Sequence, residues 1–366
     1  MRVAMVTPWF PTRKNTSMGA FVVKDARAIA DAGAEVVIFH LVAPSIDDGT
    51  RYTEVEGLKV VRIPMKPSNP VSVLRARTRM LPLLASADIV HTQAISALEP
   101  FIGASLRQPW VHTEHWSAIT SPHTLSTPAQ WALPYLLTME KWPDMVIAVC
   151  EFLAQPLREV RGTKPVEIIP CQVPAPASLV KRRMNRTDLR LISTGALIPR
   201  KDPLVAIETL AELAARGVEC SLTWLGDGPL RDECVALAEK LKVNANFPGN
   251  VDSSRVQNEI GRADMFFGPT RADNFFVAAA EAIVNGRPLV VGATGGQGEY
   301  INPVIGELVE RQDPARYADA IIALDERTRT MSAHEIAATV GDQFETRTIA
   351  GSYIDLYERL IADRSE

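Results

Sequence analysis

The sequence predicts an α/β protein built from two doubly wound domains. Short apolar runs typical of β-strands alternate with segments of helical period almost throughout the chain, which is the pattern of βαβ units and a parallel sheet. The chain has 366 residues, and a single domain averages about 150 residues. Hydrophobic residues make up 46% and charged residues 22%, enough apolar material for buried cores and too little polarity for general disorder.

The first domain is expected over residues 1–172. Strands are predicted at 2–7, 35–40, 59–63, 88–91, 110–113, 145–149 and 166–169, and helices at 20–32, 71–85, 96–106 and 128–141. Each predicted strand is followed by a helical or connecting segment, so these strands are expected to form one mostly parallel sheet.

A linker is expected at 170–186, because this segment holds three prolines and the basic run 181–183 with little periodicity. The second domain is then expected over 187–345, with strands at 189–194, 221–225, 246–247, 265–267, 289–291 and 307–309. Asp202 and Pro203 form a predicted helix start. The tail, 346–366, is predicted to be a helix that packs back on the first domain.

Composition excludes several classes of protein. The 39 Lys and Arg against 43 Asp and Glu give a net charge of −4, too balanced for general binding to nucleic-acid phosphates. The four cysteines form no CxxC pair, so neither a zinc knuckle nor a disulfide framework is indicated. No run reaches the roughly 18 apolar residues of a membrane helix. A cytoplasmic protein is expected.

Two acidic residues mark the segment 268–301. Asp273 precedes a predicted helix and Glu281 lies within it; eight residues apart, they project about 80° away from a common helix face. They are therefore not a metal-binding pair. Asp273 as a helix cap and Glu281 as a solvated helix residue remains the alternative interpretation, although the small residues 277–280 indicate a tightly packed helix.

A second motif joins a predicted strand to a helix start over residues 193–202. A helix N-terminus offers free N–H groups and partial positive charge, and Lys201 adds a full charge, so a diphosphate could be held there. Arg200 is interpreted as a solvated neighbour. Strand ends also carry histidines: His91 in one strand, and His112 with His115 in the next, at the sheet edge where ligands bind.

Together these spacings resemble the retaining nucleotide-sugar glycosyltransferases of family 4, which have the GT-B fold of two Rossmann-like domains facing across a cleft. The family's E-x7-E acid pair, its Gly-Gly-x-x-Glu turn, its G-R-L…K-G loop and its G-x-G-P turn have counterparts here. The matching residues are Asp273, Glu281, Ala282, Gly286, Pro288, Gly295, Gly296, Glu299, Gly195, Leu197, Lys201, Gly226, Gly228 and Pro229 in the second half, and Gly19 and 33–36 in the first.

The resemblance implies roles for these residues. Glu281 would accept hydrogen bonds from the nucleotide ribose, and Asp273 would hold hydroxyls of the donor sugar. Lys201 would offset charge on the departing diphosphate, and His115 would lie near the donor's phosphate and sugar. Further contacts to the nucleotide-sugar are implied for Gly195, Gly19, Asn274, Phe275 and Gly226. No metal and no cofactor beyond the nucleotide-sugar co-substrate is expected.

Three positions depart from the family pattern. Asp273 replaces the first Glu of the acid pair, Ala196 stands where the family usually has an Arg on the diphosphate, and Phe276 replaces a Gly. These departures keep a second interpretation open, a GT-B scaffold that binds a nucleotide-sugar or glycan without turnover. A third interpretation, a sugar-nucleotide epimerase, ranks last because such enzymes typically carry a different acid arrangement.

The acceptor is expected on the first domain, as a glycan, a lipid or a small molecule. The loop 8–18 carries two aromatic and two basic residues that suit a sugar or an anionic acceptor, although a solvated loop is equally consistent with them. The segment 71–81 interleaves three arginines with apolar residues. It could rest on the inner face of a membrane, but an ordinary helix with a basic edge is the favoured interpretation.

Overall fold

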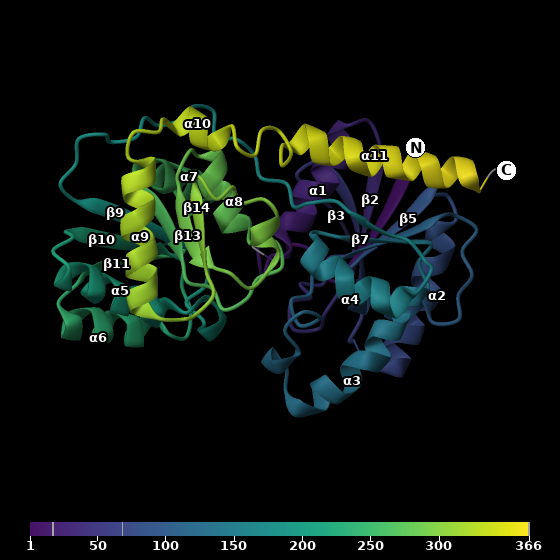
Figure 1. The fold of residues 1–366 in the computed structure, drawn as a ribbon. Helices are drawn as coiled ribbons and strands as arrows, with labels where there is room; N and C mark the ends of the chain where they lie inside the picture. Colours follow the sequence, from purple (N-terminus) through teal and green to yellow (C-terminus); the bar gives the residue numbers. More distant parts are fainter. Residues whose placement is uncertain (17, 68, 365–366) are drawn as a thin grey trace. The chain divides into compact units, whose positions relative to one another are not determined.

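The computed structural model describes residues 1–16, 18–67 and 69–364, and the chain divides into two compact units (Figure 1). Unit 1 comprises Met1–Gln172 together with the C-terminal segment from Thr346, and unit 2 comprises Val173–Glu345. Ser17, part of the loop expected to face an acceptor, lies outside the described residues.

Unit 1 contains an eight-stranded sheet in the order β3-β4-β2-β1-β5-β6-β7-β8, parallel except for the β3–β4 pair. The strands are β1 (Arg2–Thr7), β2 (Glu35–Val42), β3 (Tyr52–Val55), β4 (Leu58–Pro64), β5 (Ile89–Gln93), β6 (Trp110–Glu114), β7 (Met145–Ala148) and β8 (Val166–Ile168). The helices are α1 (Ala20–Asp31), α2 (Pro70–Leu84), α3 (Thr127–Leu137), α4 (Glu151–Arg161) and α11 (Thr346–Asp363). The hairpin of β3 and β4 adds one strand, β3, that the apolar pattern does not predict.

The C-terminal helix α11 is part of the core of unit 1. Its Tyr353 and Tyr357 are buried in one hydrophobic cluster with side chains of α1 and of the central strands. The Tyr357 hydroxyl lies 2.6 Å from Nδ1 of His91 on β5, and the other ring nitrogen of His91 lies 2.7 Å from the Thr113 hydroxyl. His91 therefore has both ring nitrogens hydrogen-bonded inside the protein, and it is a structural residue of this core.

Unit 2 contains a six-stranded, fully parallel sheet in the order β11-β10-β9-β12-β13-β14. Its strands are β9 (Leu189–Thr194), β10 (Cys220–Leu225), β11 (Asn244–Gly249), β12 (Met265–Gly268), β13 (Leu289–Gly292) and β14 (Gly306–Val309). Its helices are α5 (Pro203–Ala215), α6 (Arg231–Leu241), α7 (Ser253–Arg262), α8 (Val277–Val284), α9 (Pro314–Thr328) and α10 (Ala333–Ala337). Side chains of α5, α6 and α9 share one hydrophobic core with the sheet.

The expected linker is wrong over residues 173–186, which belong to unit 2. The physical reason is the set of ion pairs and hydrogen bonds that the arginines of this segment form. Arg183 forms ion pairs with Asp188 and Asp264, and Arg186 with Asp325. Arg182 donates to two carbonyl oxygens at the end of α9. Because buried guanidinium groups need these partners, the segment packs on the sheet, and unit 2 begins at Val173 instead of 187.

Two local expectations also differ from the structure. The helix predicted at 96–106 is a pair of 3₁₀ turns, Ile95–Ala97 and Glu99–Phe101, because Pro100 supplies no N–H for a continuing α-helix. Asp202 precedes α5, as expected, but its backbone is left-handed (φ 51°), and its side chain does not cap the helix. Its carboxylate pairs with Arg271 at 2.8 Å.

In the described part of the chain, none of the helices combines the length and the apolar character needed to cross a lipid bilayer.

Replacing Tyr357 by Phe is expected to lower the free energy of unfolding by about 1–3 kcal/mol, because a buried ring nitrogen of His91 loses its partner. Burial, with smaller contributions from His112 and His115, lowers the pKa of His91 to about 3, so the ring is neutral at pH 7 and cannot recover by taking a proton. The measurement is urea unfolding followed by circular dichroism. Tyr52→Phe is the control, since Tyr52 is 75% exposed; equal effects of the two variants would contradict the assignment.

Candidate functional site

The loops at the carboxyl ends of the unit 2 strands form a connected edge. Gly226, after β10, bridges Gly249 at the end of β11, and Asp273, after β12, bridges Gly295 after β13. The indole N–H of Trp224 donates to the Gly195 carbonyl oxygen at 2.9 Å. These contacts hold the loops after five neighbouring strands together, at the edge where open α/β sheets bind ligands.

Two cations converge on one carboxylate oxygen at this edge. Lys201 Nζ donates to Asp273 Oδ2, and Arg200 Nη1 donates to the same oxygen at 2.9 Å. The Arg200 guanidinium also donates to the Ala272 carbonyl at 2.9 Å. The three side chains are 13–26% exposed, so solvent and a ligand can reach them. The cluster carries two positive charges against one negative charge.

The electrostatics of this cluster keep Asp273 ionised. Burial raises the pKa of Asp273, but Lys201 and Arg200 together lower it below its usual range. Burial in turn lowers the pKa of Lys201, against the attraction of Asp273. The three side chains therefore form a preformed ionic cluster, and an anionic ligand could compete with Asp273 for its two basic partners.

The ring of Phe276 lies under this cluster. Lys201 Nζ stands 4.1 Å from the ring centroid, which is a cation–π contact. Phe276 has φ 60°, a left-handed conformation that favours glycine, and its ring is buried against Phe266. The Tyr300 hydroxyl lies 2.9 Å from the carbonyl oxygens of both Phe275 and Phe276. Phe276, which stands where the family has a glycine, thus keeps a backbone conformation typical of glycine, and its side chain points into the core.

The other predicted residues of unit 2 lie nearby in sequence but differ in environment. Glu281 lies in the second turn of α8 and is half-buried. Asn274 is buried, and its carbonyl accepts from Gly296 N–H at 2.7 Å. The Phe275 ring packs against Tyr300 and Phe344 at centroid distances of 5.1 and 5.2 Å, so it supports the loop from inside the core.

Backbone crowding explains two of the predicted glycines. A side chain at Gly226 (φ 141°) would place its Cβ 2.1 Å from the Gly195 carbonyl oxygen. In unit 1, a Cβ at Gly19 (φ 68°) would lie 2.1 Å from the Trp9 carbonyl oxygen. Gly195 itself has φ 131° and faces the Lys201 side chain, whose Cε would lie 3.7 Å from a Cβ. Only glycine fits the first two positions.

In unit 1, His115 follows the end of β6. The Glu114 carboxylate accepts hydrogen bonds from the backbone N–H groups of His115 and Trp116, at 2.7 and 2.6 Å. The His115 ring packs edge-on against Phe21 at 4.8 Å, and Phe21 packs against Trp9 at 5.7 Å. Burial, opposed by Glu114 and reinforced by His112, lowers the pKa of His115 to about 4. The imidazole is therefore neutral at physiological pH.

Sequence reasoning missed the role of Arg200, which it interpreted as a solvated neighbour. Its side chain is only 26% exposed and shares Asp273 with Lys201. The adjacent Arg200–Lys201 pair was a signal, but only the 3₁₀ turn Pro199–Lys201 brings both side chains to one carboxylate.

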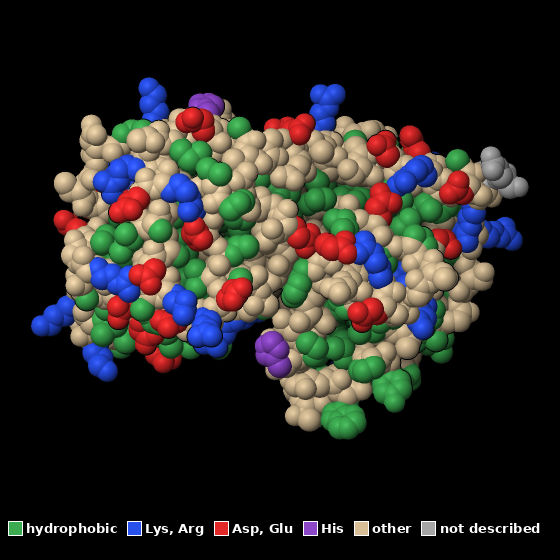
Figure 2. Space-filling model, viewed as in Figure 1, with side chains coloured by type: hydrophobic (Ala, Val, Ile, Leu, Met, Phe, Trp, Pro, Cys, Tyr) green, Lys and Arg blue, Asp and Glu red, His purple; other side chains and the backbone are tan. Residues whose placement is uncertain are grey.

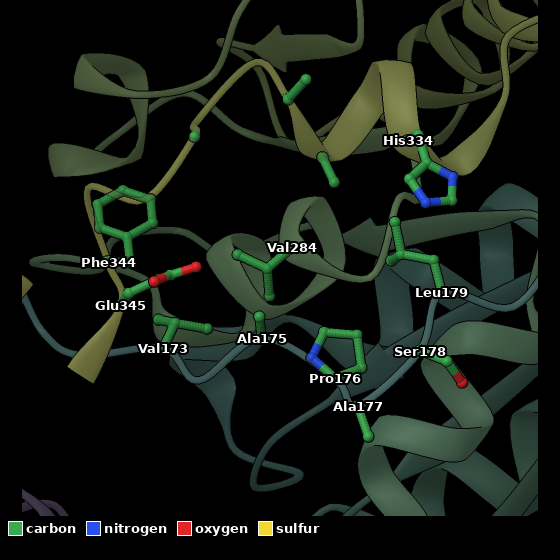
Figure 3. A pocket seen from close by; sticks show the side chains of 13 residues that line it. Val173, Ala175, Pro176, Ala177, Ser178, Leu179, Val284, His334, Phe344 and Glu345 are labelled. Atoms are coloured by element: carbon green, nitrogen blue, oxygen red, sulfur yellow. The ribbon is translucent and has the colours of Figure 1, made fainter. Parts of the chain in front are cut away.

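A separate cavity lies elsewhere in unit 2 (Figure 3). Its volume is about 440 Å³, and it is lined by residues of 173–179, α8, α10 and 338–345. None of the predicted site residues lines it. The titratable side chains that line it are those of His334, on α10, and Glu345, at the end of the segment 338–345. The cavity therefore lacks the convergent charged groups found around Asp273.

Comparison with known families covers most of the chain. Residues 18–175 match the family described as Glycosyltransferase Family 4, and residues 176–335 match Glycosyl transferases group 1. One curated relative is the GDP-mannose-dependent monoacylated alpha-(1-6)-phosphatidylinositol monomannoside mannosyltransferase of Corynebacterium glutamicum. It is 24% identical over 160 residues, which are 41% of this chain and 42% of that protein. The match thus spans less than half of that relative's length.

Solved structures share the whole fold. Sucrose-phosphate synthase from Thermosynechococcus elongatus aligns with a TM-score of 0.80 at 20% identity, over 99% of this chain and 99% of that chain. HepE from Anabaena, solved in complex with UDP-glucose, aligns with a TM-score of 0.73 at 15% identity, over 98% and 99% of the two chains. At these identities the likeness shows the fold, which is GT-B.

Replacing Gly226 by Ala is expected to lower the free energy of unfolding by about 3 kcal/mol or more, because strain at positive φ adds to the clash with the Gly195 carbonyl. Gly217→Ala is the matched control. Gly217 also has positive φ (78°), but nothing lies within 4 Å of the point that a Cβ would occupy there, so only about 1–2 kcal/mol of backbone strain is expected. Urea unfolding of both variants measures the difference. If both lose the same free energy of unfolding, the close approach of Gly226 to the Gly195 carbonyl does not contribute to stability.

Proposed function

The chain belongs to the family 4 glycosyltransferases, also described as glycosyl transferases group 1, and from this premise we propose that it transfers a sugar from a nucleotide diphosphate-sugar to an acceptor with retention of anomeric configuration. The observation that carries the proposal is the convergence of Lys201 and Arg200 on Asp273 at the carboxyl edge of the unit 2 sheet. A hexose is the proposed donor sugar.

The two cations supply what a departing diphosphate needs. Negative charge grows on the leaving group as the glycosidic bond breaks, and fixed positive groups stabilise that charge without reorganisation. Lys201 and Arg200 are already held within hydrogen-bonding distance of one anionic oxygen. In the donor complex, phosphate oxygens would take the place that Asp273 Oδ2 occupies between them. Because protein cations provide this charge, we propose that transfer needs no metal.

Asp273 gains a second role in this arrangement. When the diphosphate engages the two cations, the carboxylate is released to accept hydrogen bonds from hydroxyls of the donor sugar. Its negative charge would also favour the positive charge that develops at the anomeric carbon, since glycosyl transfer passes through an oxocarbenium-like state. No nucleophile is assigned on the opposite sugar face, so the proposed route is a front-face, ion-pair-like transfer.

Arg200 compensates for Ala196. The family resemblance implies an arginine at position 196 on the diphosphate, and this chain has alanine there. Arg200 lies one residue before Lys201 and reaches the same oxygen. We therefore assign it the second cation of the diphosphate site. This assignment argues against the interpretation that alanine at position 196 leaves a scaffold that binds the donor without turnover.

The nucleotide is assigned to unit 2 through Glu281. A carboxylate on a helix such as α8 is held in a fixed direction and can accept hydrogen bonds from both ribose hydroxyls. A nucleotide-sugar donor is supported by two similar proteins. The Corynebacterium relative is named as GDP-mannose-dependent, and HepE was solved with UDP-glucose. GDP-mannose and UDP-glucose contain different bases, so the proposal specifies a nucleotide diphosphate-sugar as the donor and does not specify the base.

The acceptor is assigned to unit 1, and His115 of the same unit is assigned to the donor's phosphate and sugar. A neutral imidazole can donate or accept a hydrogen bond, which suits contact with sugar hydroxyls or a phosphate. A lipid-linked acceptor, with peripheral membrane contact, is supported by apolar side chains on the surface. On the face in Figure 2, hydrophobic side chains gather over α3, and Trp131 and Tyr135 of this helix are each 78% exposed.

The second candidate function is binding without turnover, which the shorter acid Asp273 favours. Release of nucleoside diphosphate from candidate donors distinguishes the two. A transferase releases product with a suitable acceptor present, whereas a binding protein shows saturable affinity alone. A screen of UDP-, GDP- and ADP-sugars by thermal shift identifies the donor to use.

Lys201→Ala is expected to lower turnover by about 10²–10³-fold, with a smaller loss of nucleoside diphosphate affinity, because its charge is needed most on the leaving group. Arg200→Ala is expected to lower turnover by about 10-fold or more through the loss of a charge-assisted hydrogen bond. The measurements are steady-state kinetics and calorimetric binding of the diphosphate. Arg216→Ala, on a surface ion pair with Asp319, is the control. Full activity of both site variants would remove the diphosphate assignment.

Glu281→Gln is expected to weaken nucleoside diphosphate binding by about 10-fold or more, because hydrogen bonds to a charged acceptor are replaced by weaker ones. Thermal unfolding should remain as in the unchanged protein, because Gln preserves the size of the side chain. Glu259→Gln on α7 is the control. An unaltered affinity in Glu281→Gln would exclude the ribose contact, even if transfer itself is observed.

A further inference from the structure

Unit 1 contains a buried group of three metal-ligating side chains outside the site described above. His112 and Glu114 lie on β6, and Glu140 lies in the 3₁₀ turn Thr138–Lys141. All three side chains are 0% exposed. His112 Nε2 lies 3.4 Å from Glu114 Oε2 and 3.3 Å from Glu140 Oε1. One ligand atom from each residue lies within 4.8 Å of the other two.

The hydrogen bonds of Thr92 define how the His112 ring is protonated. The Thr92 hydroxyl accepts from Trp110 Nε1–H at 3.0 Å and donates its only hydrogen to the Val111 carbonyl at 3.3 Å. His112 Nδ1 lies 2.9 Å from the same hydroxyl, and with the Thr92 hydrogen on Val111, Nδ1 is the donor there. Burial lowers the pKa of His112, but Glu140 and Glu114 together raise it to about 9, so without a metal ion Nε2 carries a proton that faces the two carboxylates. A bound cation would take the place of that proton.

The carboxylates of Glu114 and Glu140 also face His112 Nε2. Glu114 uses Oε1 for two backbone N–H groups, which leaves Oε2 facing His112. Neither oxygen of Glu140 has a hydrogen-bond partner among the described residues, although the side chain is fully buried. Burial raises the pKa of Glu140, against the attraction of His112 and Arg161. Two buried carboxyl groups and one imidazole nitrogen thus converge where a cation could bind.

The distances from His112 Nε2 to the two carboxylates are compatible with a metal ion between the three side chains. A charge-assisted N–H···O bond is about 2.7–2.9 Å long, and one N–H can point at only one carboxylate. Ligand atoms about 2.0–2.2 Å from a tetrahedral metal ion lie about 3.3–3.6 Å from one another. The two distances from His112 Nε2, 3.3 and 3.4 Å, fit the second arrangement, and all three ligand atoms lie within 4.8 Å of one another.

We propose that His112, Glu114 and Glu140 bind a divalent metal ion of the Zn²⁺ or Mn²⁺ class. One imidazole nitrogen and two carboxylates suit these ions, and the two negative charges neutralise a divalent ion. Thr92 acts as the outer partner that orients the imidazole, as is usual for histidine ligands. The ion links β6 to the turn after α3.

The site has a structural consequence for the neighbouring loop. Glu114 would bind the ion through Oε2 while Oε1 holds the backbone of His115 and Trp116. The ion would thereby fix the turn that carries His115. The three side chains belong to unit 1 and the proposed donor residues belong to unit 2. The proposal therefore stands or falls separately from the transfer reaction, which we propose to be metal-independent.

The test uses the full chain, stripped of metal by a strong chelator and then titrated with Zn²⁺. Calorimetry and elemental analysis are expected to give about one bound ion per chain, and binding should raise the midpoint of thermal unfolding. Co²⁺ in place of Zn²⁺ should give visible absorption typical of nitrogen and oxygen ligands.

Glu140→Gln and His112→Gln are expected to weaken Zn²⁺ binding by about 100-fold or more, because each removes one of three ligands. His123→Gln is the matched control, since His123 is exposed. Absence of a stoichiometric ion in the unchanged protein would overturn the proposal. It would indicate that a proton, and no metal ion, lies between the three side chains. Equal binding by Glu140→Gln and the control would overturn it as well. If a ligand variant does not fold, the stoichiometry and Co²⁺ spectrum of the unchanged protein decide the question.

Discussion

The candidate site depends on the sharing of one Asp273 oxygen by Lys201 and Arg200. Each cation alone would be a common surface charge, but together, around a partly buried carboxylate, they form a site matched to a dianionic group. Their positions follow from the backbone. The 3₁₀ turn before α5 carries both cations, and the loop after β12 carries the acid. The glycine contacts that bring these loops together are therefore as necessary as the charged side chains.

Phe276 shows how a departure from a family pattern can be accommodated. A residue with a side chain occupies a left-handed backbone position that suits glycine, at a conformational cost. The side chain offsets that cost by packing against Phe266 and by supporting the Lys201 ammonium group through its ring face. The position therefore supports the charged cluster from below. Substitution at a glycine position is, in this case, compatible with an intact site.

The sequence predicted much of the fold and part of the site. Periodicity located the central strands of both sheets, because local pattern carries that information. Among the candidate site residues, the structure brings Lys201 and Asp273 together, whereas the role of Glu281 stays a prediction. Sequence reasoning failed where long-range partners decide the outcome. The segment 170–186 was interpreted as a linker because the partners of its arginines, Asp264 and Asp325, lie about 80 and 140 residues away in the chain. Arg200 was misinterpreted for the same reason, since its partner lies in another loop.

The amino-acid sequence by itself determined the class of the protein. Alternating strands and helices, a near-neutral charge and the spacing of acids and glycines are properties of the linear chain. Only the tertiary structure decided which charges meet. It placed Arg200 beside Lys201 on one oxygen, and it buried His112 and Glu114 next to Glu140 from a different segment. The physical reason is that electrostatic and coordination energies depend on distances of a few ångströms, which folding sets between residues that sequence separation does not relate.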